Sequence, residues 1–143
     1  MKRTAQNGFT LLELMITVAV VAILAVIANA SYQNQVTNTR RATAAVCLTE
    51  VSQFMERFYA TNLRYNTTLG GAAVAIPALQ CRTDIAAHYT ISFSAAPTAT
   101  TYTVQAVPQG AQAGRDTRCG TLTLNHTGAK TESGTGTVAD CWR

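Results

Sequence analysis

The sequence contains little charge, since Asp, Glu, Lys and Arg make up only 13% of its 143 residues. It has no glycine or proline between Phe9 and Thr61, and Glu13 is the only charged side chain between Arg3 and Arg40. The net charge of +4 is spread along the chain, so the composition shows no clustered basic face typical of a dedicated nucleic-acid binder. A chain of this length forms one domain with at most one appended segment, which excludes a multidomain enzyme.

Patterns for catalysis, metal binding and phosphate binding are also missing. The acids of the C-terminal part are isolated in the sequence, as are the two histidines: Asp84, Asp116, Glu132, Asp140, His88 and His126. None of the cysteines forms a C-x-x-C pair, which argues against zinc. No glycine-rich stretch lies between a strand and a helix with a following lysine. We therefore expect no enzymatic activity, no metal and no cofactor.

The N-terminal part contains one long apolar run, from Phe9 to Ala28. As a helix this run is about 30 Å long, enough for one bilayer crossing. Lys2 and Arg3 precede it, so the positive-inside rule places them in the cytoplasm and everything after Tyr32 on the far side. A cleaved signal peptide is the alternative, because Ala28-Asn29-Ala30 forms an A-x-A site that would release a soluble protein.

Glu13 lies inside the apolar run, where an ionised carboxylate is unfavourable without a partner. The run contains no Lys, Arg or His. A cut between Gly8 and Phe9 would create a backbone amine one helical turn from Glu13. That amine could pair with Glu13 of the same chain or of a neighbour, which would fix the axial register of a polymer. The alternative is that Glu13 reaches the membrane surface along its own side chain.

The segment Gly8-Phe9-Thr10-Leu11-Leu12-Glu13-Leu14, after a short basic leader, resembles the processing motif of the type IV prepilin family. The resemblance implies that a prepilin peptidase cuts after Gly8, that Phe9 is N-methylated, and that Glu13 guides docking into a filament at an inner-membrane assembly platform. Ala22 and Ala30 depart from the family, since many pilins have glycine and proline there. Without them we expect a straighter helix that melts less on assembly.

Beyond Ala30 the helix is expected to continue to Thr61, because no helix breaker interrupts it. Its second half is amphipathic, with apolar residues three or four positions apart: Ala44, Leu48, Val51, Met55 and Phe58. Arg40 and Arg41 fall mainly off this apolar stripe. We expect them on a solvated face, with pairing to a neighbouring subunit as the alternative.

The rest of the chain predicts a small antiparallel sheet. Residues 62–87 are expected to form an irregular connector. Residues 88–126 contain three segments in which apolar residues occupy every second position, around Ile91, Val104 and Leu122. Asn125 to Gly136 reads as a loop. The expected fold class is α+β: a long N-terminal helix packed on three to four antiparallel strands, with a C-terminal disulfide loop.

Four cysteines, Cys47, Cys81, Cys119 and Cys141, lie in the part expected outside the cytoplasm, which favours disulfides. Of the three pairings, Cys47 with Cys81 and Cys119 with Cys141 is the most local. The segment Cys119 to Asn125, with the ending Asp140-Cys141-Trp142-Arg143, is similar to the tail of the PilE minor pilins of type IVa systems. That resemblance implies a disulfide loop between Cys119 and Cys141 on the exposed edge of the head.

We therefore predict a structural subunit of a type IV pilus (fimbrium), and specifically a minor pilin that primes or joins filament assembly with other pilin subunits. The alternatives are a major pilin, a type II secretion pseudopilin and a soluble periplasmic protein. The expected segments are a cleaved leader (1–8), a membrane or filament-core helix (9–30) and a head (31–143) divided into helix (31–61), connector (62–87), sheet (88–126) and disulfide loop (119–141). The precursor would be anchored in the inner membrane with its head in the periplasm.

Twitching motility, adhesion and DNA uptake are all roles that such a pilus can have. DNA capture would need exposed positive charge on the head. The candidate residues are Arg115, Arg118 and Lys130, with Arg143 at the end of the chain. They form a weak electrostatic footprint because no exposed aromatic residues are interleaved with them in the sequence.

Overall fold

The computed structural model describes residues 10–143 and divides the chain into two compact units, residues 1–36 and residues 37–143. Gly8 and Phe9, the expected processing residues, lie outside the described part. Helix α1 (Leu11–Asn62) contributes to both units, and its 52 residues contain neither glycine nor proline. The long helix expected from the absence of breakers is therefore present.

Local side-chain contacts mark both ends of α1. At the start, the Thr10 hydroxyl oxygen accepts a hydrogen bond from the Glu13 backbone N–H (3.2 Å) and so caps the first turn. At the end, Leu63 adopts a left-handed backbone (φ 56°), and its N–H donates to the Tyr59 carbonyl (2.7 Å). The Asn62 carboxamide then holds the departing chain by accepting from the Leu69 N–H (3.0 Å). The helix thus ends at Asn62 without a glycine or a proline.

In the N-terminal unit, the large apolar side chains from Leu11 to Ile27 are exposed on all sides of the helix. This helix is long and apolar enough to cross a membrane. Among residues 10–36 nothing covers these side chains, a pattern typical of a helix that meets lipid or other apolar surfaces.

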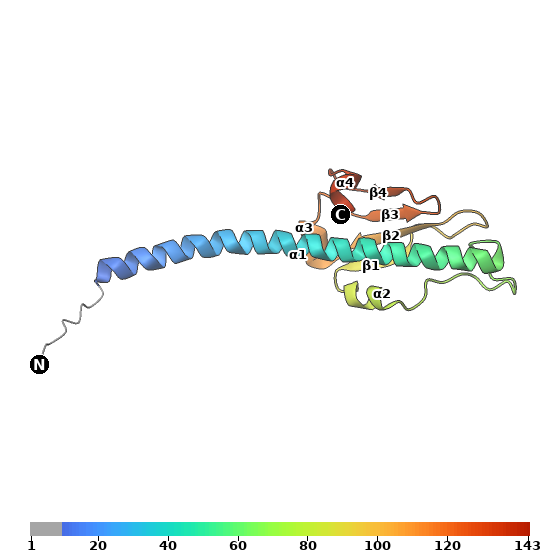
Figure 1. Cartoon of the computed structure of the whole chain (residues 1–143), viewed down its shortest axis with the longest axis horizontal. Coiled ribbons are helices and arrows are strands. Elements are labelled where there is room, and N and C mark those ends of the chain that lie inside the picture. The colour runs from blue at the N-terminus through green and yellow to red at the C-terminus, as the bar shows by residue number, and fades with distance from the viewer. Residues whose placement is uncertain (1–9) are drawn as a thin grey trace, which may run out of the picture. The chain divides into compact units, whose positions relative to one another are not determined.

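In the second unit, four antiparallel strands form one sheet in the order β1-β2-β3-β4. Their bounds are β1 (Tyr89–Phe93), β2 (Thr103–Pro108), β3 (Leu122–Asn125) and β4 (Lys130–Glu132). The C-terminal part of α1 runs along this sheet (Figure 1). The short helix α2 (Gln80–Ile85) lies beside the edge strand β1, and α4 (Val138–Cys141) lies beside the opposite edge strand β4.

The core of the head lies between α1 and one face of the sheet. Its buried members include Ala44, Leu48, Val51 and Met55 from the helix, and Tyr89, Ile91, Val104, Ala106, Leu122 and Leu124 from the strands. Alternate strand residues face the helix, as the period of two predicts. The other face carries threonine, serine and glutamine, some of them paired across strands, such as the Thr123 and Thr131 hydroxyls (2.6 Å).

The prediction of a loop from Asn125 to Gly136 was wrong, because β4 lies within it. The Asn125 carboxamide oxygen accepts from the Thr127 N–H (3.0 Å) and the Ala129 N–H (2.9 Å), and Gly128 supplies a positive φ of 79°. This tight turn returns the chain as a three-residue strand along β3. The strand has no apolar alternation, so periodicity could not reveal it.

Two further short helices complete the head. Helix α3 (Gly110–Arg115) lies between β2 and β3, and α4 lies in the predicted C-terminal disulfide loop. Both are too short for a helical period to show in the sequence. The Thr137 hydroxyl caps α4 by accepting from the Asp140 N–H (3.3 Å).

Two disulfides link distant segments of the head. Cys47 on α1 bonds Cys81 on α2, and Cys119 before β3 bonds Cys141 at the end of α4. The first attaches the connector to the long helix. The second attaches the C-terminal segment to the start of β3, and no free cysteine is found in residues 10–143.

Candidate functional site

A buried polar cluster holds α1 against the segment that follows α3. The Asp116 side chain accepts hydrogen bonds from the Arg41 guanidinium (2.5 Å) and the Tyr89 hydroxyl (2.5 Å), and the residue is only 2% exposed. Gln112 donates to the Thr37 carbonyl (3.1 Å) and to the Tyr89 hydroxyl (3.1 Å). Arg41 therefore does not belong to a solvated face, and that expectation was wrong. Its ion-pair partner is in the same chain, 75 residues away.

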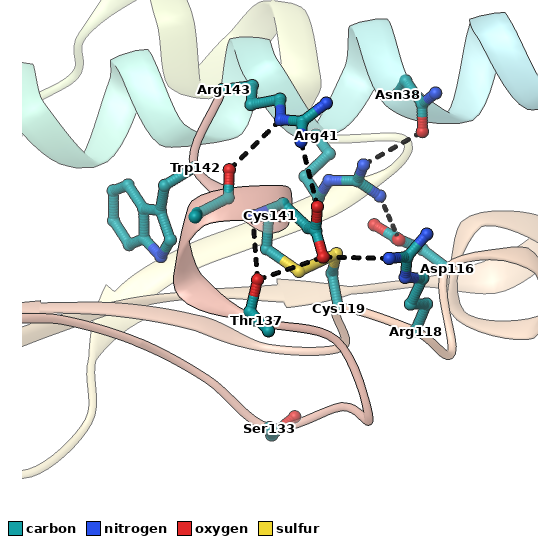
Figure 2. The surroundings of a disulfide bond; sticks show 12 residues. Asn38, Arg41, Asp116, Arg118, Cys119, Ser133, Thr137, Cys141, Trp142 and Arg143 are labelled. Carbon is teal, nitrogen blue, oxygen red and sulfur yellow. Dashed lines mark hydrogen bonds and ion pairs between the residues drawn. A yellow bond between two sulfur atoms is a disulfide. The ribbon is translucent and has the colours of Figure 1, made fainter.

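Burial and the hydrogen bond to Asp116 raise the pKa of the Tyr89 hydroxyl, so it stays protonated and continues to donate. A carboxylate buried this deeply is stable only while its donors are in place. The cluster therefore fixes where α3 ends, and with it the start of the segment that carries Arg118 (Figure 2).

A second polar cluster lies around Glu56 of α1. Its carboxylate accepts from the hydroxyls of Tyr65 (3.1 Å) and Tyr102 (3.0 Å). Burial, and then the hydrogen bond to Glu56, raises the pKa of Tyr65 to about 12 from its usual value of 10.0. The stabilisation from this shift is fully present below pH 10 and is lost as the pH rises through about 12. At physiological pH the Tyr65 hydroxyl is therefore protonated and keeps its hydrogen bond to Glu56.

The C-terminal segment folds closely over the chain around Arg118. The Arg118 carbonyl accepts from the Gly136 N–H (2.7 Å), and the Cys119 carbonyl accepts from the Gly134 N–H (3.2 Å). A side chain at Gly134 would collide with the Arg118 carbonyl oxygen, so this approach requires glycine there. Together with the disulfide to Cys141, these contacts hold α4 and the chain end beside Arg118.

Two exposed arginines meet at one carboxylate in this segment. Asp140 pairs with Arg118 (2.9 Å) through one carboxylate oxygen and with Arg143 (3.0 Å) through the other. The Thr137 hydroxyl also donates to Asp140 (3.0 Å). That hydrogen bond and the charge of Arg118 lower the pKa of Asp140, which therefore stays ionised at neutral pH.

A cation and an aromatic ring lie next to this group. The Lys130 ammonium of β4 is 5.0 Å from the centre of the Trp142 ring, and the indole N–H donates to the Thr131 carbonyl (3.1 Å). Trp142 packs partly against the core and directly precedes Arg143. The ring thus has a fixed place between the Lys130 side chain and the chain end.

The C-terminal surface, as we call it, consists of Arg118, Lys130, Asp140, Trp142 and Arg143. It contains three of the four sequence-predicted cations. Arg115, the fourth, is exposed at the end of α3 and makes no ion pair within residues 10–143.

The sequence alone does not indicate that Asp140 or Trp142 belongs to a site, although both lie in the tail motif. Their roles depend on the Cys119–Cys141 bond, which brings the chain end to β4 and Arg118. Glu13 lies in the first turn of α1.

Other features of the head do not form a recognisable site. A groove of about 380 Å³ between α2 and β1 is lined mainly by small and apolar residues, including Ala78, Leu79 and Ile91. Within residues 10–143 no three His, Cys, Asp or Glu residues come together to hold a metal. His126 instead makes an edge contact with the Tyr102 ring.

Comparison with known proteins decides the family. A family model described as "Type IV minor pilin ComP, DNA uptake sequence receptor" matches residues 30–123, more than half of the chain. The chain belongs to this family of minor pilins. A model of the prokaryotic N-terminal methylation motif matches residues 3–29. The prediction of a minor pilin is thereby confirmed.

One solved structure shows the same fold. A type IV pilin from Shewanella oneidensis has a TM-score of 0.51 and 24% sequence identity, over 75% of this chain and 98% of that chain. The non-core minor pilin PilV of Neisseria meningitidis has a TM-score of 0.47 and 19% identity, over 70% of this chain and 89% of that chain. The long helix with a four-stranded antiparallel sheet is the type IV pilin fold, as predicted.

ComP-family membership gives the chain a structural role. Type IV pilins assemble with other pilin subunits, and this chain is a minor pilin of the type IV class. Its methylation motif and apolar helix fit a membrane-anchored precursor that enters a pilus.

Proposed function

We propose that this minor pilin binds DNA through the C-terminal surface of its head and serves DNA uptake. The observation that carries the proposal is the grouping of Arg118, Lys130 and Arg143 on the C-terminal surface, where Asp140 is the only acid within residues 10–143 that forms ion pairs with these cations. The description of the family as a DNA uptake sequence receptor supports it. Three cations held within one small surface suit a phosphate backbone, which carries closely spaced negative charges.

Two neighbouring features support the same surface. Arg115 adds an exposed positive charge three positions before Arg118, and the matched family region includes both arginines. Trp142 adds a half-buried aromatic ring beside Lys130, which the spacing of the cations in the sequence did not indicate. Aromatic faces next to cations stabilise nucleic acids by stacking.

Neutralising three cations should weaken DNA binding strongly. We expect Arg115→Gln, Arg118→Gln and Lys130→Gln together to reduce the affinity for a short fluorescein-labelled duplex by roughly tenfold or more. The slope of log K against the logarithm of the salt concentration should become shallower by about two to three. Fluorescence anisotropy of the full mature chain in a nonionic detergent measures both quantities.

A matched control removes the same charge elsewhere. Arg40→Gln, Arg57→Gln and Arg64→Gln give the same net charge but alter α1 and the residue that follows Leu63. Binding close to that of the wild type in this control places the DNA at the C-terminal surface. Equal losses in the two triple variants, or no loss in the first, contradict that site.

The membrane and assembly steps complete the proposal. Residues 1–8 are removed as a leader by a prepilin peptidase acting between Gly8 and Phe9, and Phe9 is methylated. Residues 9–30 hold the precursor in the inner membrane as a single pass, with residues 31–143 in the periplasm. At the assembly platform, Glu13 pairs with the new amine of a neighbour and sets the register. The protein acts as a subunit and receptor, with no enzymatic activity.

A further inference from the structure

The shared contact at Asp140 is unlike an ordinary surface ion pair, because one carboxylate serves two guanidinium groups. Its oxygens bind separately, one to Arg118 (2.9 Å) and one to Arg143 (3.0 Å). The Thr137 hydroxyl holds the same carboxylate from a third side (3.0 Å). Asp140 is therefore oriented by three donors before any ligand arrives.

This arrangement resembles the way in which guanidinium groups hold a phosphate. Charged hydrogen bonds from two arginines to the two oxygens of one anion are the geometry that arginine provides for carboxylates and phosphates alike. The side chains of Arg118 and Arg143 are 69% and 77% exposed, whereas that of Asp140 is 29% exposed. An incoming phosphate can thus reach both guanidiniums, while Asp140 stays behind them.

From these contacts we propose that Asp140 determines specificity as an internal competitor for the DNA phosphate: it occupies Arg118 and Arg143 in the free protein and gives them up on binding. This inference rests on the proposed DNA-binding function. Exposed ion pairs are weak, so exchange of partners is feasible. The competition nevertheless lowers the affinity for any backbone phosphate that is not supported by further contacts, and so suppresses binding to arbitrary sequence.

Removing the competing charge should therefore strengthen non-specific binding. For Asp140→Asn we expect the affinity for a random-sequence duplex at about 0.15 M salt to rise roughly fivefold to tenfold, with a salt dependence steeper by about one unit. The slope becomes steeper because Arg118 and Arg143, freed from Asp140, attract anions from the salt. DNA binding must then displace these anions. Asparagine can still accept from Thr137, and the α4 cap uses only the backbone N–H of residue 140, so the fold should persist.

Asp84→Asn is the matched control, since it removes the same charge from α2, beside the opposite edge of the sheet. Asp84 accepts from Gln80 (2.8 Å) and pairs with no arginine in the described part of the chain. Both variants are measured by anisotropy on the full mature chain in nonionic detergent, with equal thermal midpoints as the check on folding. Tighter and more salt-sensitive binding by Asp140→Asn alone supports the inference.

The outcomes separate this inference from the proposed function. If the wild type binds DNA through Arg115, Arg118 and Lys130 but Asp140→Asn behaves like Asp84→Asn, the competitor role is overturned and the DNA-binding function stands. Weaker binding by Asp140→Asn also overturns it, because Asp140 would then be positioning the arginines for DNA. If neither the wild type nor Asp140→Asn binds the duplex, the proposed function fails and the inference fails with it.

Discussion

Replacement of Arg41 by methionine should lower the free energy of unfolding of the head by about 3–5 kcal/mol. The substitution leaves Asp116 as a buried carboxylate whose remaining neutral donors are Tyr89 and Gln112. An uncompensated charge in such a place is among the largest single-residue effects known in proteins. Urea unfolding of the full chain in detergent, followed by fluorescence of its single tryptophan, Trp142, measures the loss.

Two controls isolate the ion pair in this experiment. Arg40→Met changes the neighbouring residue and should alter stability by less than about 0.5 kcal/mol. The double variant Arg41→Met with Asp116→Leu removes both charges and should recover much of the loss, because an apolar pair can replace a buried ion pair. Equal effects of Arg40→Met and Arg41→Met would show that Asp116 does not depend on Arg41.

Loss of the Cys119–Cys141 bond should affect both stability and DNA binding. Replacing both cysteines with serine removes a cross-link between residues 22 positions apart. This should lower the free energy of unfolding by about 3 kcal/mol. The bond also holds α4 and the chain end beside Arg118, so the affinity for a duplex should fall roughly fivefold or more under conditions where the protein remains folded. Urea unfolding and fluorescence anisotropy measure the two effects.

The other disulfide provides a matched comparison. Cys47 and Cys81 are 34 positions apart and attach α2 to α1, so their replacement with serine should lower stability by a similar amount, about 3–4 kcal/mol. DNA binding by the folded protein should be unchanged, since this bond adjoins β1 rather than β4. Equal losses of affinity in the two double variants would argue against a DNA site near Cys141.

Much of the fold could be predicted because local patterns determine it. The long helix follows from the absence of glycine and proline, and three strands follow from alternation of apolar and polar residues. Strand β4 could not be predicted in this way, because Lys130-Thr131-Glu132 has no apolar alternation and is formed by the turn at Asn125. Its place depends on pairing with β3.

The polar contacts of the head could not be predicted because they join distant parts of the sequence. Nothing near Arg41 in the chain indicates Asp116, and only folding of α1 against the segment after α3 brings them together. Asp140 and Trp142 were visible as part of a tail motif. Their relation to Arg118 and Lys130 required the disulfide and the β3–β4 pairing.

Above all, we expect this chain to enter a type IV pilus as a processed minor subunit. Mass spectrometry of pili sheared from the producing cells tests it most directly, since it gives both the N-terminus and the amount of this chain relative to other subunits. We expect the chain to begin at methylated Phe9 and to be present in quantities far below those of the main pilin. Absence of the chain from the pili, or a soluble form that begins at Ser31, would contradict it.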